Sequence, residues 1–257
     1  MSVWGKVIGG VAGFALGGPL GAMMGVMAGN IYDKSRKRKT SSTHQGIPNQ
    51  QKQYQEISSQ EKQHIFALSV ITLTAKLAKA DGVVTQDEIE VFKEKFKIPP
   101  NEEDQVRKIF NEAQKTVYGF ESIAQQVGEL FQDSHEVLEE ILNNLFYVAE
   151  ADGKISESEL SFLKTVSSTF KFDENTFQRI YQARLSDKES DPYKVLGVKR
   201  TDDEETIKKA WIKLTKEHHP DNLVAKGMPP EFIEQATRET SSINTAYDKI
   251  NKERDVN

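Results

Sequence analysis

Glycine occupies every fourth position near the start of this chain, from residue 5 to residue 29. The repeat consists of Gly5, Gly9, Gly13, Gly17, Gly21, Gly25 and Gly29. A four-residue step returns to nearly the same side of an α-helix, so these glycines would line one continuous groove. In a water-exposed helix each would cost roughly 1 kcal/mol relative to alanine. Lipid forces backbone hydrogen bonds to form within the helix, and the repeat therefore favours a membrane helix.

The charge pattern around this repeat supports a membrane span. No charged residue occurs between Lys6 and Asp33, and this stretch is longer than the ~20 residues that a bilayer-spanning helix needs. A cleaved signal peptide would have a basic start and an A-x-A site, whereas this segment has one lysine and no such site. We therefore predict a transmembrane Gly-zipper segment over residues 1–33, which forms a homodimer through its glycine face.

Positive charge is concentrated on one side of the predicted span. Lys6 stands alone before it, whereas the residues that follow it include Lys34, Arg36, Lys37, Arg38 and Lys39. Because basic residues near a span remain in the cytoplasm, we expect a single-pass protein with its N-terminus outside. Residues 34–59 are polar, and we expect them to form a basic, Gln-rich linker.

The tripeptide Ala-Asp-Gly occurs twice in the middle of the chain, at residues 80–82 and 151–153. Each copy follows a helical pattern and continues into a Ser/Thr-x-x-Glu capping box, formed by Thr85 with Glu88 and by Ser156 with Glu159. Glycine can end a helix in a left-handed conformation, and Ser or Thr can begin the next one. The repeat therefore predicts two helix–loop–helix connections.

The same sequence also matches the second half of a calcium-binding EF-hand loop. Where such a loop needs its first two ligands, the first copy has Leu77 and Lys79, and the second has Val148 and Glu150. Too few oxygen ligands remain for a calcium site, so we predict no bound metal and no cofactor. A weak acidic metal site near the second copy stays open as an alternative.

Apolar periodicity predicts further helices, at about residues 101–117, 120–131, 134–151 and 173–186. No window alternates with a period of two as a half-buried strand would, so the predicted fold class is all-α.

Two amphipathic helices are predicted near the C-terminus. The first runs from Asp203 to Glu217, with a capping box of Thr201 and Glu204 at its start. Its apolar stripe consists of Ile207, Ala210, Trp211 and Leu214, and its basic residues are Lys208, Lys209, Lys213 and Lys216. The stripe of the second helix consists of Ile243, Ala246, Tyr247 and Ile250. We expect a helical hairpin with His219, Pro220 and Asp221 in its exposed connection, because proline holds the chain at a bend.

These motifs resemble a known module. Residues 189–257 resemble a J-domain. In this region DPY and LGV precede a basic helix, which is followed by His-Pro-Asp and then by a helix containing IN-x-AY. The KADG and EADG repeat resembles a TerB-like domain, over residues 60–187. A Gly-rich membrane segment, a TerB-like domain and a J-domain follow one another over nearly the whole chain. This order of domains is similar to that of the DjlA family of bacterial membrane co-chaperones.

The resemblance implies a membrane-tethered co-chaperone in protein folding and stress response. Its site residues for a DnaK-type ATP-dependent chaperone would be His219, Pro220, Asp221, Lys208, Lys209, Lys213 and Lys216. The lysines would orient docking on an acidic surface, and the tripeptide would stimulate ATP hydrolysis by the partner. Three residues depart from the common pattern of the family: Trp211 and Ile212 would make the interface slightly less polar, and Asn222, in place of a frequent basic residue, would lower the affinity. The implied location is the bacterial inner membrane, with the C-terminal domains in the cytoplasm.

Other classes of function find less support. The net charge of −5 gives no general reason to bind nucleic acid, and the absence of cysteine excludes thiol catalysis and a cysteine-rich zinc module. The chain lacks a Ser/His/Asp set, a P-loop and a dinucleotide motif, so we predict that it is not an enzyme. A membrane-anchored scaffold that acts mainly through the TerB-like domain, with weak metal binding, is the remaining alternative.

Overall fold

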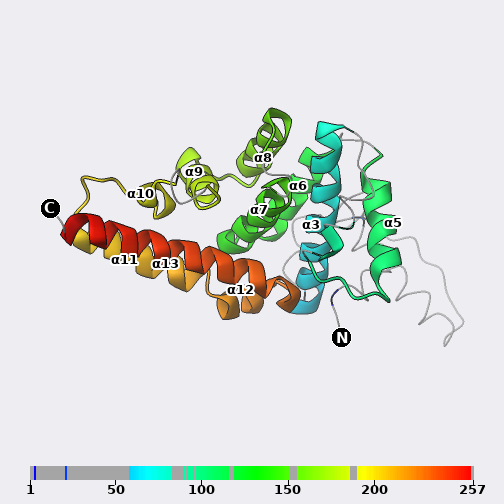
Figure 1. Cartoon of the computed structure of the whole chain (residues 1–257). Helices are drawn as coiled ribbons and strands as arrows, with labels where there is room; N and C mark the ends of the chain where they lie inside the picture. The colour runs from blue at the N-terminus through cyan, green and yellow to red at the C-terminus, as the bar shows by residue number, and fades with distance from the viewer. Residues whose placement is uncertain are drawn as a thin grey trace, which may run out of the picture.

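The computed structural model contains only helices and their connections in the residues it describes (Figure 1). Those residues are Val3, Gly21, 58–82, 90, 92–94, 96–115, 119–150, 155–185 and 190–255. The expectation of an all-α fold is confirmed for this part of the chain. Most of the predicted transmembrane segment, six of its seven glycines and nearly all of the predicted linker lie outside it.

The beginning of the chain is represented by two described positions. The backbone N–H of Val3 donates to Glu231 Oε1 at 2.7 Å, so residue 3 contacts the C-terminal part of the protein. Gly21 is helical. None of the helices within the described ranges is both long enough and apolar enough to cross a bilayer.

Helix α3 (Ser59–Asp81) is the centre of the middle part of the protein. It is buried at every position from 65 to 77, as expected for a helix that other helices surround. Ser58 and Glu61 form a reciprocal capping box at its start. Gly82 ends it, as predicted for the first Ala-Asp-Gly copy, but with a φ of 148° and a ψ of −123° instead of the left-handed conformation that was expected.

The surrounding helices are α5 (Glu103–Ala113), α6 (Phe120–Leu130), α7 (His135–Ala149), α8 (Glu157–Thr169) and α9 (Glu174–Gln182). Of these, α5, α6, α7 and α9 lie within the predicted ranges, and α8 begins at its predicted capping box. Four of them, α5 to α8, pack directly against α3. Ser156 and Glu159 form the predicted capping box of α8, whereas the box of Thr85 and Glu88 lies outside the described residues. We call α3 to α9 the middle bundle.

The C-terminal part is a hairpin of two long helices. It comprises α10 (Pro192–Val195), α11 (Glu204–Glu217), α12 (Pro220–Lys226), the short 3-10 helix η4 (Pro230–Phe232) and α13 (Ile233–Asp255). The predicted apolar stripes of α11 and α13 meet in a small core that includes Tyr193, Leu196, Ile207, Leu214, Ile243, Ala246 and Ile250. We call α11 and α13 the C-terminal hairpin.

The start of α11 differs from the prediction. The helix begins at Glu204, and the carboxylate of Asp203 accepts the backbone N–H of Thr206 at 2.7 Å. Aspartate is a strong N-cap residue, and its use here leaves Thr201 in the preceding turn. The predicted capping box of Thr201 with Glu204 is therefore wrong.

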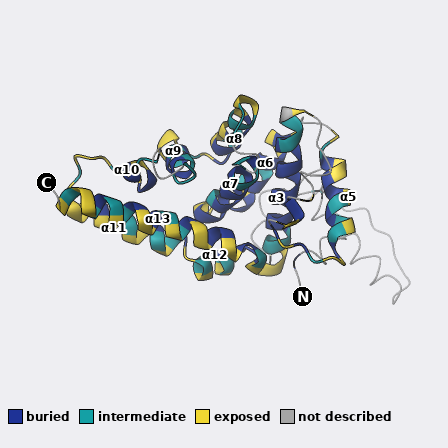
Figure 2. Cartoon of the chain, in the orientation of Figure 1, coloured by how far each residue is buried: buried dark blue, intermediate teal, exposed yellow. Residues whose placement is uncertain are grey.

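The region after the His-Pro-Asp tripeptide packs on the middle bundle. Leu223, Met228, Phe232 and Ala236 belong to the large core around α3, not to the core of the hairpin. The Phe232 ring lies 4.9 Å from that of Phe66 and 5.3 Å from that of Phe96, centroid to centroid. In Figure 2, buried residues extend from α3 and α7 into the α12 end of the hairpin. The middle bundle and the C-terminal hairpin therefore share a core.

Candidate functional site

The His-Pro-Asp tripeptide forms the turn between α11 and α12. His219 is the N-cap of α12, and its Nδ1 accepts the backbone N–H of Asp221 at 3.2 Å. Pro220 is the first residue of the helix, where its fixed φ fits and its missing N–H costs nothing. The side chains of His219 and Asp221 are 54% and 93% exposed. The tripeptide thus lies at an exposed bend, as expected, but it also begins a short helix.

All four predicted lysines of α11 are exposed. Lys209 Nζ lies 2.6 Å from Glu205 Oε1, and Lys213 Nζ lies 4.0 Å from Glu217 Oε1. Exposed pairs of this kind contribute little free energy, so an acidic partner can displace the glutamates at small cost. Lys216 lies one helical turn before His219, which places positive charge close to the tripeptide.

The three residues that depart from the common J-domain pattern have different roles in the structure. The Trp211 ring stacks on that of Tyr247 at 4.3 Å, and its Nε1 donates to Asn244 Oδ1 at 2.8 Å. Asn222 Nδ2 donates to the backbone oxygen of Glu217 at 2.8 Å. These two side chains hold helices together. Ile212 is 49% exposed and adds apolar surface to α11.

His218, the residue before the tripeptide, faces the protein interior. Its side chain is 1% exposed and lies between two carboxylates of α7, with Nε2 at 3.0 Å from Glu139 Oε2 and Nδ1 at 3.0 Å from Glu140 Oε1. Its backbone oxygen accepts the hydroxyl of Thr240 at 3.1 Å. The sequence patterns did not predict this buried contact. The available signal was the pair of adjacent glutamates, Glu139 and Glu140, between the buried apolar residues Leu138 and Ile141 of α7.

The pKa values of His218, Glu139 and Glu140 indicate the charge that His218 carries at neutral pH. Burial opposes a positive charge on His218, but the hydrogen bonds to Glu139 and Glu140 raise its pKa to about 10. Burial opposes a negative charge on Glu139, but the neighbouring Arg179 and His218 lower its pKa to about 2. Burial raises the pKa of Glu140. At neutral pH His218 is therefore a buried imidazolium held by α7.

Two arginines extend this buried group to other helices. Arg179 pairs with Glu139 and lies 3.8 Å from Glu239 of α13. Arg184 lies 3.8 Å from Glu239 and donates to Asn143 Oδ1 at 3.0 Å. Buried charges are costly unless they are paired, and these pairs join α7, α13 and the chain at and just after α9.

The described portions of the two EF-hand-like repeats show no metal site. Leu77 is buried in the core, and Glu150 Oε1 lies 3.7 Å from Arg184 Nη1. Within the ranges that the structure describes, no group of three or more His, Asp or Glu side chains could hold a metal ion.

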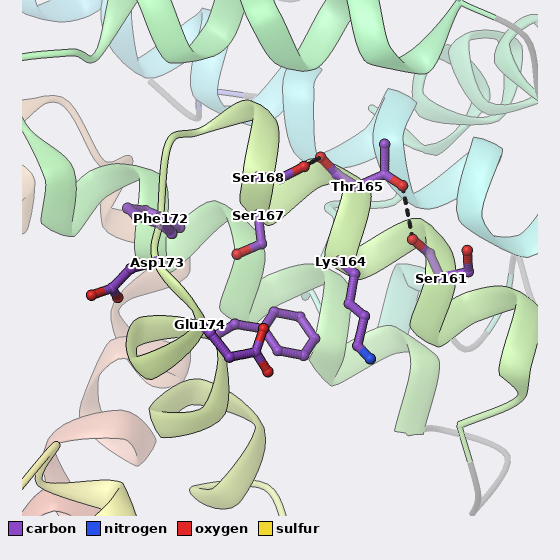
Figure 3. A pocket seen from close by; sticks show the side chains of 9 residues that line it. Ser161, Lys164, Thr165, Ser167, Ser168, Phe172, Asp173 and Glu174 are labelled. Atoms are coloured by element: carbon purple, nitrogen blue, oxygen red, sulfur yellow. Dashed lines mark hydrogen bonds between the residues drawn. The ribbon is translucent and has the colours of Figure 1, made fainter.

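A polar hollow of about 360 Å³ lies between the end of α8 and the start of α9 (Figure 3). Three of its polar side chains bond to the local backbone. Thr165 Oγ1 donates to the oxygen of Ser161 at 2.9 Å, Ser168 Oγ donates to the oxygen of Thr165 at 2.9 Å, and Asp173 caps α9. We assign no ligand to this hollow.

Comparison with known proteins gives three family matches. Residues 1–39 match the transmembrane domain of co-chaperone DjlA, residues 67–182 match tellurite resistance protein TerB, and residues 191–255 match the DnaJ domain. Curated relatives named co-chaperone protein DjlA extend over nearly the whole chain. The protein from Shewanella oneidensis is 31% identical and covers 99% of both chains. That from Photobacterium profundum is 28% identical over 98% of this chain and 99% of its own. No solved structure matches.

Proposed function

The chain belongs to the DjlA family of co-chaperones, and from this premise we propose that its J-domain binds a DnaK-type chaperone and stimulates ATP hydrolysis by it. The observation that carries the proposal is the placement of the His-Pro-Asp turn. His219 and Asp221 project into solvent at the end of a helix that bears four exposed lysines. An acidic partner surface would be steered by the lysines and would then meet the tripeptide.

The lysines and the tripeptide have separate tasks in this proposal. Charges at the edge of an interface mainly raise the association rate, because their attraction acts over distance. The tripeptide acts at contact range, where its exposed imidazole and carboxylate can bond to the ATPase machinery of the partner. The chain itself then catalyses no reaction and needs no cofactor.

The protein is anchored to a membrane, as its match to the DjlA transmembrane domain indicates. We propose that this is the inner membrane of a bacterium, crossed once, with the J-domain in the cytoplasm beside its ATP-dependent partner. The basic residues of positions 34–39 support this orientation. The contact between Val3 and Glu231 would place the N-terminus on the J-domain side instead, so the orientation needs a direct test.

The absence of native cysteine allows that test without background labelling. Single variants Ser2→Cys and Ser241→Cys would be exposed in spheroplasts to a maleimide that does not cross membranes. We expect labelling at position 2 and none at position 241 until the membrane is permeabilised. Protection of position 2 in intact spheroplasts would contradict the proposed orientation.

We also propose that the membrane segment forms a homodimer. Its glycine groove leaves no side chain to hold two helices apart. The paired change Gly13→Leu with Gly17→Leu should weaken dimers in a membrane-association reporter, while insertion stays intact. The matched change of Val11 and Ala15 to leucine alters positions outside the glycine face and should leave dimerisation unchanged.

The central experiment measures ATP turnover by a DnaK-type chaperone in the presence of the full chain in liposomes. We expect stimulation by the wild-type protein and its loss in His219→Gln. His135→Gln is the matched control, because His135 is also exposed but lies at the start of α7. A scaffold that acts only through the TerB-like domain would leave the wild-type chain without stimulation and His219→Gln without a defect in cells.

A further inference from the structure

The J-domain and the TerB-like domain are joined by an apolar contact that immediately follows the His-Pro-Asp turn. Leu223, Met228 and Phe232 are fully buried in the core of the middle bundle. Gly227 has a φ of 115°, and a Cβ at this position would lie 2.9 Å from Lys62 Cβ of α3. The backbone of this segment therefore approaches the middle bundle as closely as glycine allows.

Polar contacts surround this apolar contact. Lys226 pairs with Glu136 of α7, and Asn222 Nδ2 lies 3.5 Å from the same carboxylate. At the opposite edge, Arg238 of α13 lies over the ring of Tyr147, 5.1 Å from its centroid. The contact therefore has a defined orientation as well as apolar area.

The residue that connects this contact to the exposed turn is His218. Both nitrogens of its ring are held by α7, one by Glu139 and one by Glu140, and its backbone oxygen is held by Thr240. His219 is the next residue in the chain and the N-cap of α12, so the contacts of His218 constrain where its backbone lies. The position of the exposed imidazole is thus tied to two carboxylates of the other domain.

We propose that Glu139 and Glu140 of the TerB-like domain are positioning residues for the His-Pro-Asp turn, and that they act through His218. The proposal rests on the proposed function of the J-domain and adds a task for the TerB-like domain within it. Apolar contacts alone would hold the domains together, but they are not directional. Hydrogen bonds to both ring nitrogens select one orientation of His218, and therefore one presentation of the turn.

Two quantities describe stimulation, and we expect them to respond differently. The first is the half-saturating concentration, which is the concentration of this protein that gives half of the maximal stimulation. The second is the maximal stimulated rate. Docking by the lysines of α11 needs only the exposed helix face, so the half-saturating concentration should not depend on the His218 site. The maximal rate should depend on it, because a turn that samples several orientations is competent for only part of the time.

The test replaces the polar pair by apolar residues of similar size in the full chain. In His218→Met with Glu140→Leu, stability should be retained or increased, since well-packed apolar residues often replace a buried ion pair without loss. We expect the maximal stimulated rate to fall about tenfold while the half-saturating concentration stays within about twofold. Glu140→Gln keeps an acceptor for His218 and should behave like the wild type.

Hydrogen–deuterium exchange supplies a readout that does not depend on ATP turnover. The backbone amides of residues 219–223 should exchange faster in the double variant, whereas those at the centre of α3 should not change. If the double variant does not fold, Glu140→Leu alone should show the same pattern to a smaller degree, because the pair of His218 with Glu139 remains.

The outcomes distinguish this inference from the function on which it rests. Stimulation by the wild type together with its loss in His219→Gln supports the proposed function. A folded double variant with a wild-type maximal rate and unchanged exchange would then overturn the positioning role alone. A wild-type chain that gives no stimulation would overturn both.

Discussion

His218 and His219 are consecutive residues with opposite environments. The first is buried between Glu139 and Glu140, whereas the side chain of the second is 54% exposed. They form the connection between α11, which ends at Glu217, and α12, which Pro220 begins. The two histidines therefore have separable effects on stability and on activity.

Replacing each histidine by alanine should separate those effects. His218→Ala leaves buried carboxylates without their partner and should lower the free energy of unfolding by about 3–5 kcal/mol. His219→Ala should change it by no more than about 0.5 kcal/mol, because the side chain projects into solvent. Urea unfolding of a protein covering residues 58–255 would measure both. Equal effects would contradict the buried position of His218.

Stability should fall as pH rises above neutrality. The pKa of His218 is raised from 6.5 to about 10 in the folded protein, so the folded state holds a proton that the unfolded state releases. The stabilisation is complete below pH 6.5 and is lost as pH rises through about 10. The raised pKa of Glu140 acts in the same direction.

The measurement is the urea midpoint at pH values on both sides of that window. His218→Gln should reduce the decline with pH, because it removes the group that holds the proton. The control is His135→Gln, which alters an exposed histidine and should keep the full decline. A decline of the same size in His218→Gln would assign the pH dependence to other groups.

Phe232 should stabilise the TerB-like domain although it belongs to the J-domain match. Its ring is fully buried against Phe66 and Phe96, so Phe232→Ala should cost about 3–5 kcal/mol. Ile212→Ala provides the contrast, since that side chain is 49% exposed and its loss should cost little. Faster hydrogen exchange in α3 of the Phe232 variant would show that the loss reaches the middle bundle. Exchange that changes only in α11 and the C-terminal half of α13 would speak against a shared core.

Charge reversal on α11 should weaken docking without lowering the maximal rate. Lys209→Glu with Lys213→Glu removes attraction to an acidic partner, and the half-saturating concentration should rise most at low salt, where screening is weakest. Lys108→Glu with Lys164→Glu changes the net charge equally at exposed positions on α5 and α8. We expect no effect from this control. A salt-independent defect in the α11 variant would argue against electrostatic steering.

Calcium should not stabilise the protein. Leu77 occupies a buried position where a loop would need a ligand, and Glu150 faces Arg184. A ligand that binds the folded state must raise its melting temperature. The chain should therefore melt at the same temperature in chelator and in millimolar calcium, by circular dichroism. A rise of several degrees in calcium would restore the metal-binding alternative.

The sequence was sufficient for most features that depend on local information. The ranges of α5, α6, α7 and α9 follow from apolar periodicity, and the start of α8 follows from the capping box of Ser156 and Glu159. The stripes on α11 and α13 predicted the hairpin, and Pro220 predicted an exposed bend. Each of these features depends on residues within a few helical turns, where spacing and conformational preference are decisive.

Local sequence rules predicted the wrong N-cap for α11. Both Thr201 and Asp203 are good N-cap residues, and the choice between them depends on where the preceding turn leaves the chain. In the structure, the backbone N–H of Lys199 donates to Asp202 at 2.9 Å, and α11 starts after Asp203. Spacing alone could not distinguish these two starts.

The sequence by itself determined the longer helices and the exposure of the His-Pro-Asp motif, whereas only the tertiary structure decided the short helix α12 that begins at this motif and the residues that pack behind it. His218 and Glu140 are 78 residues apart, and Phe232 and Phe66 are also distant in the chain. Periodicity describes which side of a helix is apolar, but it does not specify the partner that covers it. A buried charge has no periodic pattern, since its cost is offset by a specific group elsewhere in the chain. The link between the TerB-like domain and the His-Pro-Asp turn therefore becomes visible only when the chain is folded.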